Sequence, residues 1–235
     1  MGTIAGRVER LDWAALEQSL DAFGYATTGP LLTGAECETL VELYQDEARF
    51  RSRVDMARYG FGSGEYKYLS RPLPELVEEL RTSFYPCLAP IASRWAEALG
   101  DPTYPPELAD FLEVCAQHGQ TRPTPLILKY EAGDYNCLHQ DLYGDVAFPI
   151  QMTFALSRRG EDYTGGEFLL LEQRPRAQSR GQAVTLEQGE AVIFTTRYRP
   201  VRGSRGWYRM NLRHGVSRLL SGRRFTLGII FHDAR

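Results

Sequence analysis

The hydrophobic pattern changes its period once along the chain, near Pro123, and this change constrains the fold more than any other feature. Before it, apolar residues recur at steps of three and four, which is typical of amphipathic helices. After it, apolar and polar residues alternate over short runs that end at glycine-containing turns, which is typical of antiparallel strands. Helices followed by strands predict an α+β protein.

The first half contains four segments with helical spacing and one glycine-rich, aromatic segment. The longest helical segment contains Pro86 and Pro90, which should bend or split it. The glycine-rich segment is expected to be a surface loop or a flap over a site. The expected helices are Trp13–Phe23, Glu36–Tyr44, Pro74–Leu99 and Pro106–His118, and the glycine-rich segment is Tyr59–Tyr66.

The second half contains short strands and no segment with helical spacing, which predicts a closed antiparallel β structure. We expect residues 123–235 to form a double-stranded β-helix (a jelly-roll, cupin-like core). Residues 1–122 are expected to form a mainly helical N-terminal extension packed outside this core, within one structural domain. The predicted strands are Leu126–Tyr130, Ile150–Leu156 (half-buried), Glu167–Leu171, Ala191–Thr195 and Arg223–Phe231.

Composition excludes several classes of protein. No apolar run approaches the roughly 20 residues of a membrane span, and the segment from Met1 to Trp13 carries both charge signs without the apolar stretch of a secretory signal. The four cysteines lie 50, 28 and 22 residues apart, which matches neither a zinc knuckle nor a disulfide scaffold. These features predict a reduced, cytoplasmic protein without a membrane partner.

The net charge of −3 conceals an uneven distribution. Residues 1–157 carry 12 Lys+Arg against 23 Asp+Glu, whereas residues 158–224 carry 14 Arg, no Lys and 6 Asp+Glu. Arginine favours planar, bidentate contacts to carboxylate or phosphate. Two explanations remain open: the basic half packs on the acidic half, or it binds nucleic acid or another anionic partner.

A metal site is suggested by His139, Asp141 and His214. Residues two apart on a strand point to the same face, so His139 and Asp141 can reach one ion. Two imidazoles and one carboxylate form a facial triad, which leaves coordination positions open for oxygen-activating ferrous iron.

The last predicted strand has two chemically different faces. Phe225, Leu227 and Ile229 share one face, which belongs in a core. Arg224 and Thr226 share the other face, on which the strand carries no acidic residue. A buried arginine needs an anionic partner, and we expect that partner to be a ligand.

Together these residues resemble those of the iron(II)- and 2-oxoglutarate-dependent dioxygenases. The resemblance implies that His139, Asp141 and His214 bind Fe(II), and that Arg224 and Thr226 hold the distal carboxylate of 2-oxoglutarate. It also places Tyr130, less directly, in the oxoacid or substrate pocket. O2 would be the co-substrate, and oxidative decarboxylation of 2-oxoglutarate would be coupled to hydroxylation of a substrate C–H bond.

The segment before His214 suggests a substrate. Residues 197–213 contain six arginines, two tyrosines and a tryptophan, which suit the phosphates and bases of DNA or RNA. The chain resembles a bacterial oxygenase group assigned to repair of alkylated nucleic acid, which implies oxidative demethylation. The substrate contacts proposed on this basis are Arg202, Arg205, Trp207, Tyr208 and Arg209.

Other substrates and one other class of protein remain open. Dealkylases of the AlkB type carry Arg-x-Asn-x-Thr-x-Arg on the last strand, whereas this chain has Thr226, Gly228 and Ile230 after Arg224. The chain as a whole resembles the prolyl-hydroxylase-like members of the dioxygenases more closely, and this resemblance implies a protein or peptide substrate. A small metabolite is a third option. The fourth is a non-catalytic, cupin-like protein that binds a metal or ligand without turnover.

Overall fold

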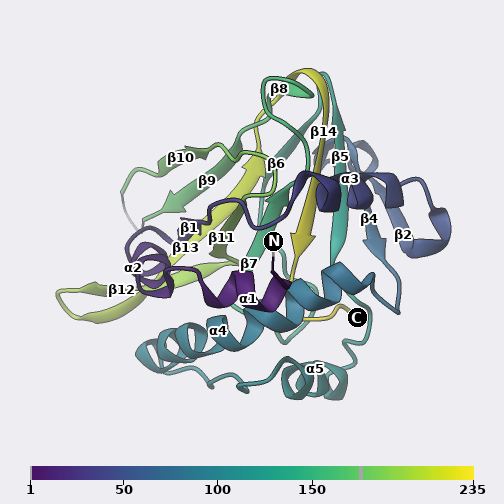
Figure 1. Ribbon diagram of the computed structural model, residues 1–235. Coiled ribbons are helices and arrows are strands. Elements are labelled where there is room, and N and C mark those ends of the chain that lie inside the picture. Colours follow the sequence, from purple (N-terminus) through teal and green to yellow (C-terminus); the bar gives the residue numbers. More distant parts are fainter. Residues whose placement is uncertain (1, 175–176) are drawn as a thin grey trace.

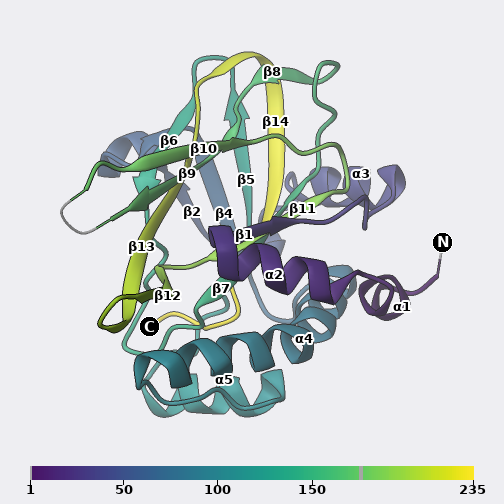
Figure 2. The ribbon, with the colours of Figure 1, turned by 90° about the vertical axis from the view of Figure 1, so that its left-hand side faces the viewer.

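Two antiparallel β-sheets face each other, and most of the helices lie outside one of them (Figures 1 and 2). The computed structural model describes residues 2–174 and 177–235. In strand order, the larger sheet consists of β1 (Tyr25–Thr27), β11 (Ala191–Thr195), β7 (Ile150–Ala155), β14 (Leu219–Ile229), β5 (Leu126–Glu131), β4 (Glu65–Leu69) and β2 (Phe50–Asp55), with β8 (Tyr163–Gly165) beside β14. The smaller sheet consists of β10 (Arg180–Val184), β9 (Phe168–Gln173), β13 (Gly206–Val216), β6 (Tyr135–His139) and β3 (Gly62–Ser63), with β12 (Tyr198–Gly203) beside β13.

The helices occur where helical spacing predicted them, with one addition at the N-terminus. None of those described is long and apolar enough to cross a membrane. The α-helices are α1 (Ile4–Glu9), which was not predicted, α2 (Trp13–Phe23), α3 (Gly34–Leu43), α4 (Glu75–Leu99) and α5 (Leu108–Gln117), and two short 3₁₀ turns cover Glu47–Arg49 and Met56–Tyr59.

The main core lies between the helices and the outer face of the larger sheet. Phe225, Leu227 and Ile229 of β14 pack there with Leu80 and Phe84 of α4. The apolar face of β14 therefore lies where the sequence predicted it. The inner faces of the two sheets form a second apolar cluster beside the cavity described below. This arrangement confirms the α+β class and is consistent with a double-stranded β-helix core.

Helix α4 is not split at Pro86 and Pro90, and of the expected bend or split this corrects the split. An internal proline costs about 3 kcal/mol or more, because one backbone hydrogen bond is lost and the ring contacts the preceding turn. Eleven residues of α4 are buried. Since a fully buried large apolar side chain contributes about 1.5–3 kcal/mol, this packing can offset two prolines.

Strand β7 is buried on both faces, so the prediction of a half-buried strand was wrong. Ile150, Met152 and Phe154 pack into the main core. Gln151 and Thr153 face inward and line the cavity between the sheets. The polar residues of this strand are directed to an enclosed site, not to solvent.

The first 122 residues contribute strands as well as helices. Strand β4 pairs with β5, β1 pairs with β11, and β3 pairs with β6. The segment expected to be a loop or flap, Tyr59–Tyr66, thus supplies β3 and the start of β4. β1 and β3 were missed because they have only three and two residues. β2 was missed although Phe50, Ser52 and Val54 alternate with charged residues, as in a strand with one solvated face.

A partly buried ion pair joins α1 to the start of α3. The guanidinium of Arg7 donates to both carboxylate oxygens of Glu36, at 2.7 and 2.9 Å. Glu36 also accepts a hydrogen bond from the backbone of Thr33, which caps α3. The hydrogen bond from Arg7 is the main reason why the pKa of Glu36 falls from 4.5 to about 2.

We predict that Glu36→Gln lowers the free energy of unfolding by about 1–2 kcal/mol at pH 6, because the charge-assisted pair with Arg7 is lost, whereas glutamine can still accept the capping hydrogen bond from Thr33. The folded-state pKa is depressed, so this contribution is complete above pH 4.5 and decreases as the pH falls towards 2. Urea unfolding of both proteins at pH 6, 4 and 3 tests this. A stability difference that stays constant across these pH values would contradict it.

Candidate active site

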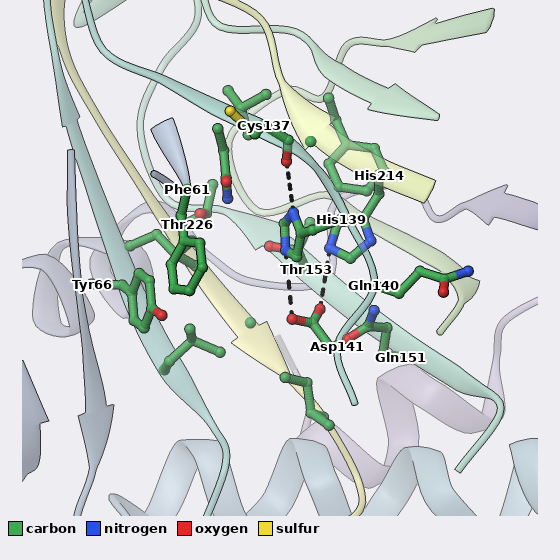
Figure 3. A pocket seen from close by; sticks show the side chains of 18 of the residues that line it. Phe61, Tyr66, Cys137, His139, Gln140, Asp141, Gln151, Thr153, His214 and Thr226 are labelled. Carbon is green, nitrogen blue, oxygen red and sulfur yellow. Dashed lines mark hydrogen bonds and ion pairs between the residues drawn. The ribbon is translucent and has the colours of Figure 1, made fainter. Parts of the chain in front are cut away.

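The side chains of His139, Asp141 and His214 meet at one end of the cavity between the sheets (Figure 3). His139 ends β6, and its register partner on β13 is His214, so two residues 75 positions apart in the sequence lie side by side. Asp141 follows β6. One ligand atom from each of the three residues lies within 4.8 Å of the other two. The structure therefore brings together the three predicted metal ligands.

Neighbouring groups orient these three side chains. The Nδ1 of His139 is 2.8 Å from the carbonyl oxygen of Cys137, to which it must donate, so in the neutral ring the free lone pair is on Nε2. Nε2 lies 3.5 Å from Oδ1 of Asp141, and Nε2 of His214 lies 3.1 Å from Oδ2. The hydroxyl of Tyr143 donates to Oδ1 of Asp141 at 2.7 Å. Such partners fix the orientation of metal ligands.

The electrostatics of the cluster favour the protonation states of metal ligands at Asp141 and His214, but not at His139. Burial would raise the pKa of Asp141, but His214 and His139 hold it well below its usual range. Burial and the neighbouring His139 lower the pKa of His214, which favours the neutral ring. Burial also opposes protonation of His139, but contact with Asp141 outweighs it and raises the pKa. An ionised Asp141 and a neutral His214 fit a ferrous ion, and His139 would give up its proton on binding one.

The cavity continues from this cluster to Arg224 on β14. Its volume is about 420 Å³, and Tyr130 and Thr226 also line it. Volumes of about 300–1,000 Å³ are typical of small-molecule sites. The six residues predicted from the sequence to bind iron or 2-oxoglutarate thus line a single cavity.

Arg224 has no anionic partner within the described part of the chain. Only 3% of the residue is exposed, and its Nε and Nη1 atoms have no hydrogen-bond partner there. The rings of Tyr130 and Tyr163 lie 5.6 and 5.8 Å from the guanidinium carbon. A buried guanidinium without a partner destabilises the folded protein, so we expect an anion to bind at this end of the cavity. A carboxylate of 2-oxoglutarate fits this requirement.

Several cavity residues were not found by sequence reasoning. Tyr143 follows Asp141 by two residues, as Asp141 follows His139, and this spacing could have indicated that its side chain points to the same site. Gln151 gave no such signal, because its alternation with apolar residues on β7 predicted that it faces solvent. The other missed lining residues include Phe61, Tyr66, Asn136, Thr153 and Phe194.

The arginine-rich segment, residues 197–213, forms most of the hairpin of β12 and β13 (Figure 1). None of its residues lines the cavity, which begins on β13 at His214. Two of its arginines bind carboxylates of this chain: Arg199 pairs with Glu172 at 2.9 Å, and Arg209 pairs with Asp101 at 2.5 Å. The other proposed substrate contacts lie towards the tip. There, the guanidinium of Arg202 lies over the ring of Trp207 at 5.6 Å. Of these two pairs, only that of Arg209 and Asp101 joins the basic part of the chain, residues 158–224, to the acidic part, residues 1–157.

The amino-acid sequence matches a known family over most of its length. Residues 64–234 match Oxygenase-NA, described as an oxygenase "catalysing oxidative methylation of damaged DNA". An uncharacterised protein of Mycobacterium tuberculosis is 54% identical over 164 residues, which are 69% of this chain and 70% of the relative.

Solved structures share the fold at low sequence identity. A prolyl-4-hydroxylase of Pseudomonas putida superposes with a TM-score of 0.56 at 14% identity, covering 95% of this chain and 99% of that one. An oxidoreductase of the 2OG-Fe(II) oxygenase family from Burkholderia pseudomallei gives 0.51 at 14% identity, covering 94% and 92%. The fold is that of the 2OG-Fe(II) oxygenases.

We predict that Tyr143→Phe weakens binding of Fe(II) by roughly tenfold, because Asp141 loses the hydrogen bond that orients its carboxylate. Anaerobic equilibrium binding of Fe(II) measures this. Tyr85→Phe is the matched control, since its hydroxyl donates to the carbonyl of Pro105, away from the cluster. Equal Fe(II) affinity in the Tyr143→Phe variant and the unaltered protein would show that Tyr143 has no such role.

Proposed function

The chain belongs to the Oxygenase-NA family and has the fold of the 2OG-Fe(II) oxygenases, and from this we propose that it removes methyl groups from alkylated nucleic acid by oxidation. The cofactors are Fe(II) and 2-oxoglutarate, with O2 as co-substrate. The observation that carries the assignment is the cavity that joins an unpaired, buried Arg224 to a cluster of His139, Asp141 and His214.

Each group of residues has a distinct part in this proposal. His139, Asp141 and His214 would hold the iron on one side and leave its other positions open. Arg224 would bind the distal carboxylate of 2-oxoglutarate, and the hydroxyl of Thr226 would assist it. Bound iron and 2-oxoglutarate supply the oxidising chemistry. The chain orients them and limits the access of water to the buried end of the cavity.

The overall reaction balances without a further reductant. One O2 and one 2-oxoglutarate give succinate, CO2 and one oxygen atom inserted into a C–H bond of the N-methyl group. The resulting N-hydroxymethyl group breaks its C–N bond, releasing formaldehyde while the base nitrogen recovers a proton or lone pair. Arg224 argues for this chemistry over a binding protein without turnover, since simple binding of a metal needs no carboxylate clamp.

The proposal extends to the hairpin of β12 and β13 as the nucleic-acid contact. Trp207 is 47% exposed, which suits base stacking, and Arg202 and Arg205 lie near the turn. Tyr208 and Arg209 complete the proposed set. Arg209 would contribute less, because its guanidinium is already paired with Asp101.

A peptide or protein side chain is the second candidate substrate. The Pseudomonas putida protein with the same fold is a prolyl-4-hydroxylase, and the last strand lacks the Asn, Thr and second Arg of the AlkB-type frame. A hydroxylase of this kind would add one oxygen to its target and release no formaldehyde. The same assay therefore separates the two functions. A small metabolite remains a third option.

We predict succinate and formaldehyde in equal amounts when the Fe(II)-loaded protein is given 2-oxoglutarate, O2 and a methylated single-stranded oligonucleotide. His139→Ala should abolish both products, because a metal ligand is lost. Arg224→Ala should raise the KM for 2-oxoglutarate at least tenfold, because a charge-assisted contact of about 1.5–3 kcal/mol is lost. Succinate without formaldehyde from any methylated oligonucleotide would contradict the proposed substrate. The absence of both products with every substrate class would favour the non-catalytic alternative.

We also predict that replacing Arg202 and Arg205 together by alanine weakens binding of single-stranded DNA. The slope of log K against log salt concentration should fall by ~0.7 for each phosphate contact removed. Fluorescence anisotropy at several salt concentrations measures this. The double variant Arg10→Ala and Arg49→Ala removes the same charge elsewhere on the surface and serves as the control. If both double variants bind alike, the hairpin is not the nucleic-acid contact.

A further inference from the structure

Gln151 is a buried amide in the cavity whose donor is unused within the described residues. It lies on β7 beside Asp141 (Figure 3), and only 2% of it is exposed. Its Nε2 atom is buried and has no hydrogen-bond partner there. An unsatisfied buried donor costs about 1–3 kcal/mol, so this position is explained best by an acceptor that enters with a ligand.

The sheet register separates Gln151 from the Arg224 end of the cavity. On β7 and β14, Thr226 is opposite Ala155 and Gly228 is opposite Thr153, so Gln151 lies beyond both pairs. The β14 residue at the level of Gln151 lies six positions after Arg224. Along an extended strand, the Cα atoms of two such residues are roughly 20 Å apart. The amide of Gln151 therefore lies towards the iron end of the cavity, where the primary substrate and the iron-facing end of 2-oxoglutarate would meet. Its acceptor would come from one of these two molecules.

An aromatic wall faces the same part of the cavity. Phe61 and Tyr66 lie across from the His139 and Asp141 side chains (Figure 3). Phe61 is 47% exposed and stacks on Tyr59, with ring centroids 5.5 Å apart and planes inclined by 20°. Nearly parallel rings at a cavity mouth present a flat face to an entering group.

The backbone holds Phe61 in this place. Its carbonyl oxygen accepts a hydrogen bond from Cys137 at 2.8 Å, two residues before His139. The next residue, Gly62, has φ +132°, and a Cβ atom there would lie 2.4 Å from the carbonyl oxygen of Tyr135. Phe61 is thus fixed relative to the strand that carries His139, as a recognition surface requires.

We infer that Phe61 and Gln151 form a subsite for a planar methylated base, in which the base stacks on Phe61 and a ring carbonyl accepts a hydrogen bond from the Gln151 amide. The inference rests on the proposed function and names its substrate more closely. The carbonyl must lie close to the N-methyl group, because Gln151 lies beside Asp141. A base such as 3-methylcytosine, with a carbonyl next to the methylated nitrogen, fits this requirement. 1-Methyladenine, which has no carbonyl, does not.

The test compares oligonucleotides of the same sequence that carry one 3-methylcytosine or one 1-methyladenine. The unaltered protein should release formaldehyde with a kcat/KM about tenfold higher for 3-methylcytosine, as loss of one satisfied buried hydrogen bond predicts. Gln151→Leu should remove this preference by lowering the 3-methylcytosine value. Gln45→Leu, on the exposed surface, should leave it unchanged.

The stacking contact is tested separately with Phe61→Leu, which keeps an apolar side chain but removes the ring. It should lower kcat/KM about tenfold for both bases, since base stacking contributes about 1–3 kcal/mol per base. Phe23→Leu removes an equally exposed ring on α2 and is the control. An unchanged kcat/KM in Phe61→Leu would overturn the stacking role.

Binding of Fe(II) and 2-oxoglutarate is measured in the same variants by anaerobic optical titration. This distinguishes failure of the proposed subsite from failure of the proposed function. If Gln151→Leu weakens binding of either cofactor, the amide serves the cofactors and the inference is wrong. If Gln151→Leu keeps the base preference, the inference fails while the proposed function stands. If the unaltered protein releases formaldehyde from neither base, or instead hydroxylates a peptide, the proposed function fails and the subsite fails with it.

Discussion

The two-sided burial of β14 is the constraint on which the rest of the molecule depends. One face carries Phe225, Leu227 and Ile229 into the core beneath the helices. The other carries Arg224 and Thr226 into the cavity between the sheets. Since side chains alternate strictly along a strand, a shift of one residue would exchange the two faces. The register that builds the core therefore also fixes the direction of the guanidinium.

The metal cluster depends on a second pairing, between β6 and β13. This pairing places His214 opposite His139, and the chain after β6 returns Asp141 to the same point. Rings of Phe168 and Phe194 pack against His214, with centroids 5.8 and 4.8 Å away, so the ligand is held by apolar contacts as well as by the sheet. Such support keeps a site rigid enough to bind a metal in one geometry.

The uneven charge of the chain serves more than one purpose. Within the arginine-rich segment, Arg199 is buried against Glu172, and Arg209 is paired with Asp101 after α4. These contacts attach the hairpin to the rest of the molecule and use basic residues structurally. Arg202 and Arg205 lie nearer the turn and have no ion pair within the described part of the chain, which is why the proposed nucleic-acid contact includes them.

The sequence by itself determined the class of fold, the three metal ligands and the pocket-facing position of Arg224, because each depends on alternation along one strand or on residue types with few chemical uses. Only the tertiary structure decided that β7 is buried on both faces, that α4 continues through Pro86 and Pro90, and that Gln151 lies beside Asp141. The physical reason is the same in each case. Burial by a distant segment overrides a local preference, and no local pattern reveals which segment that will be.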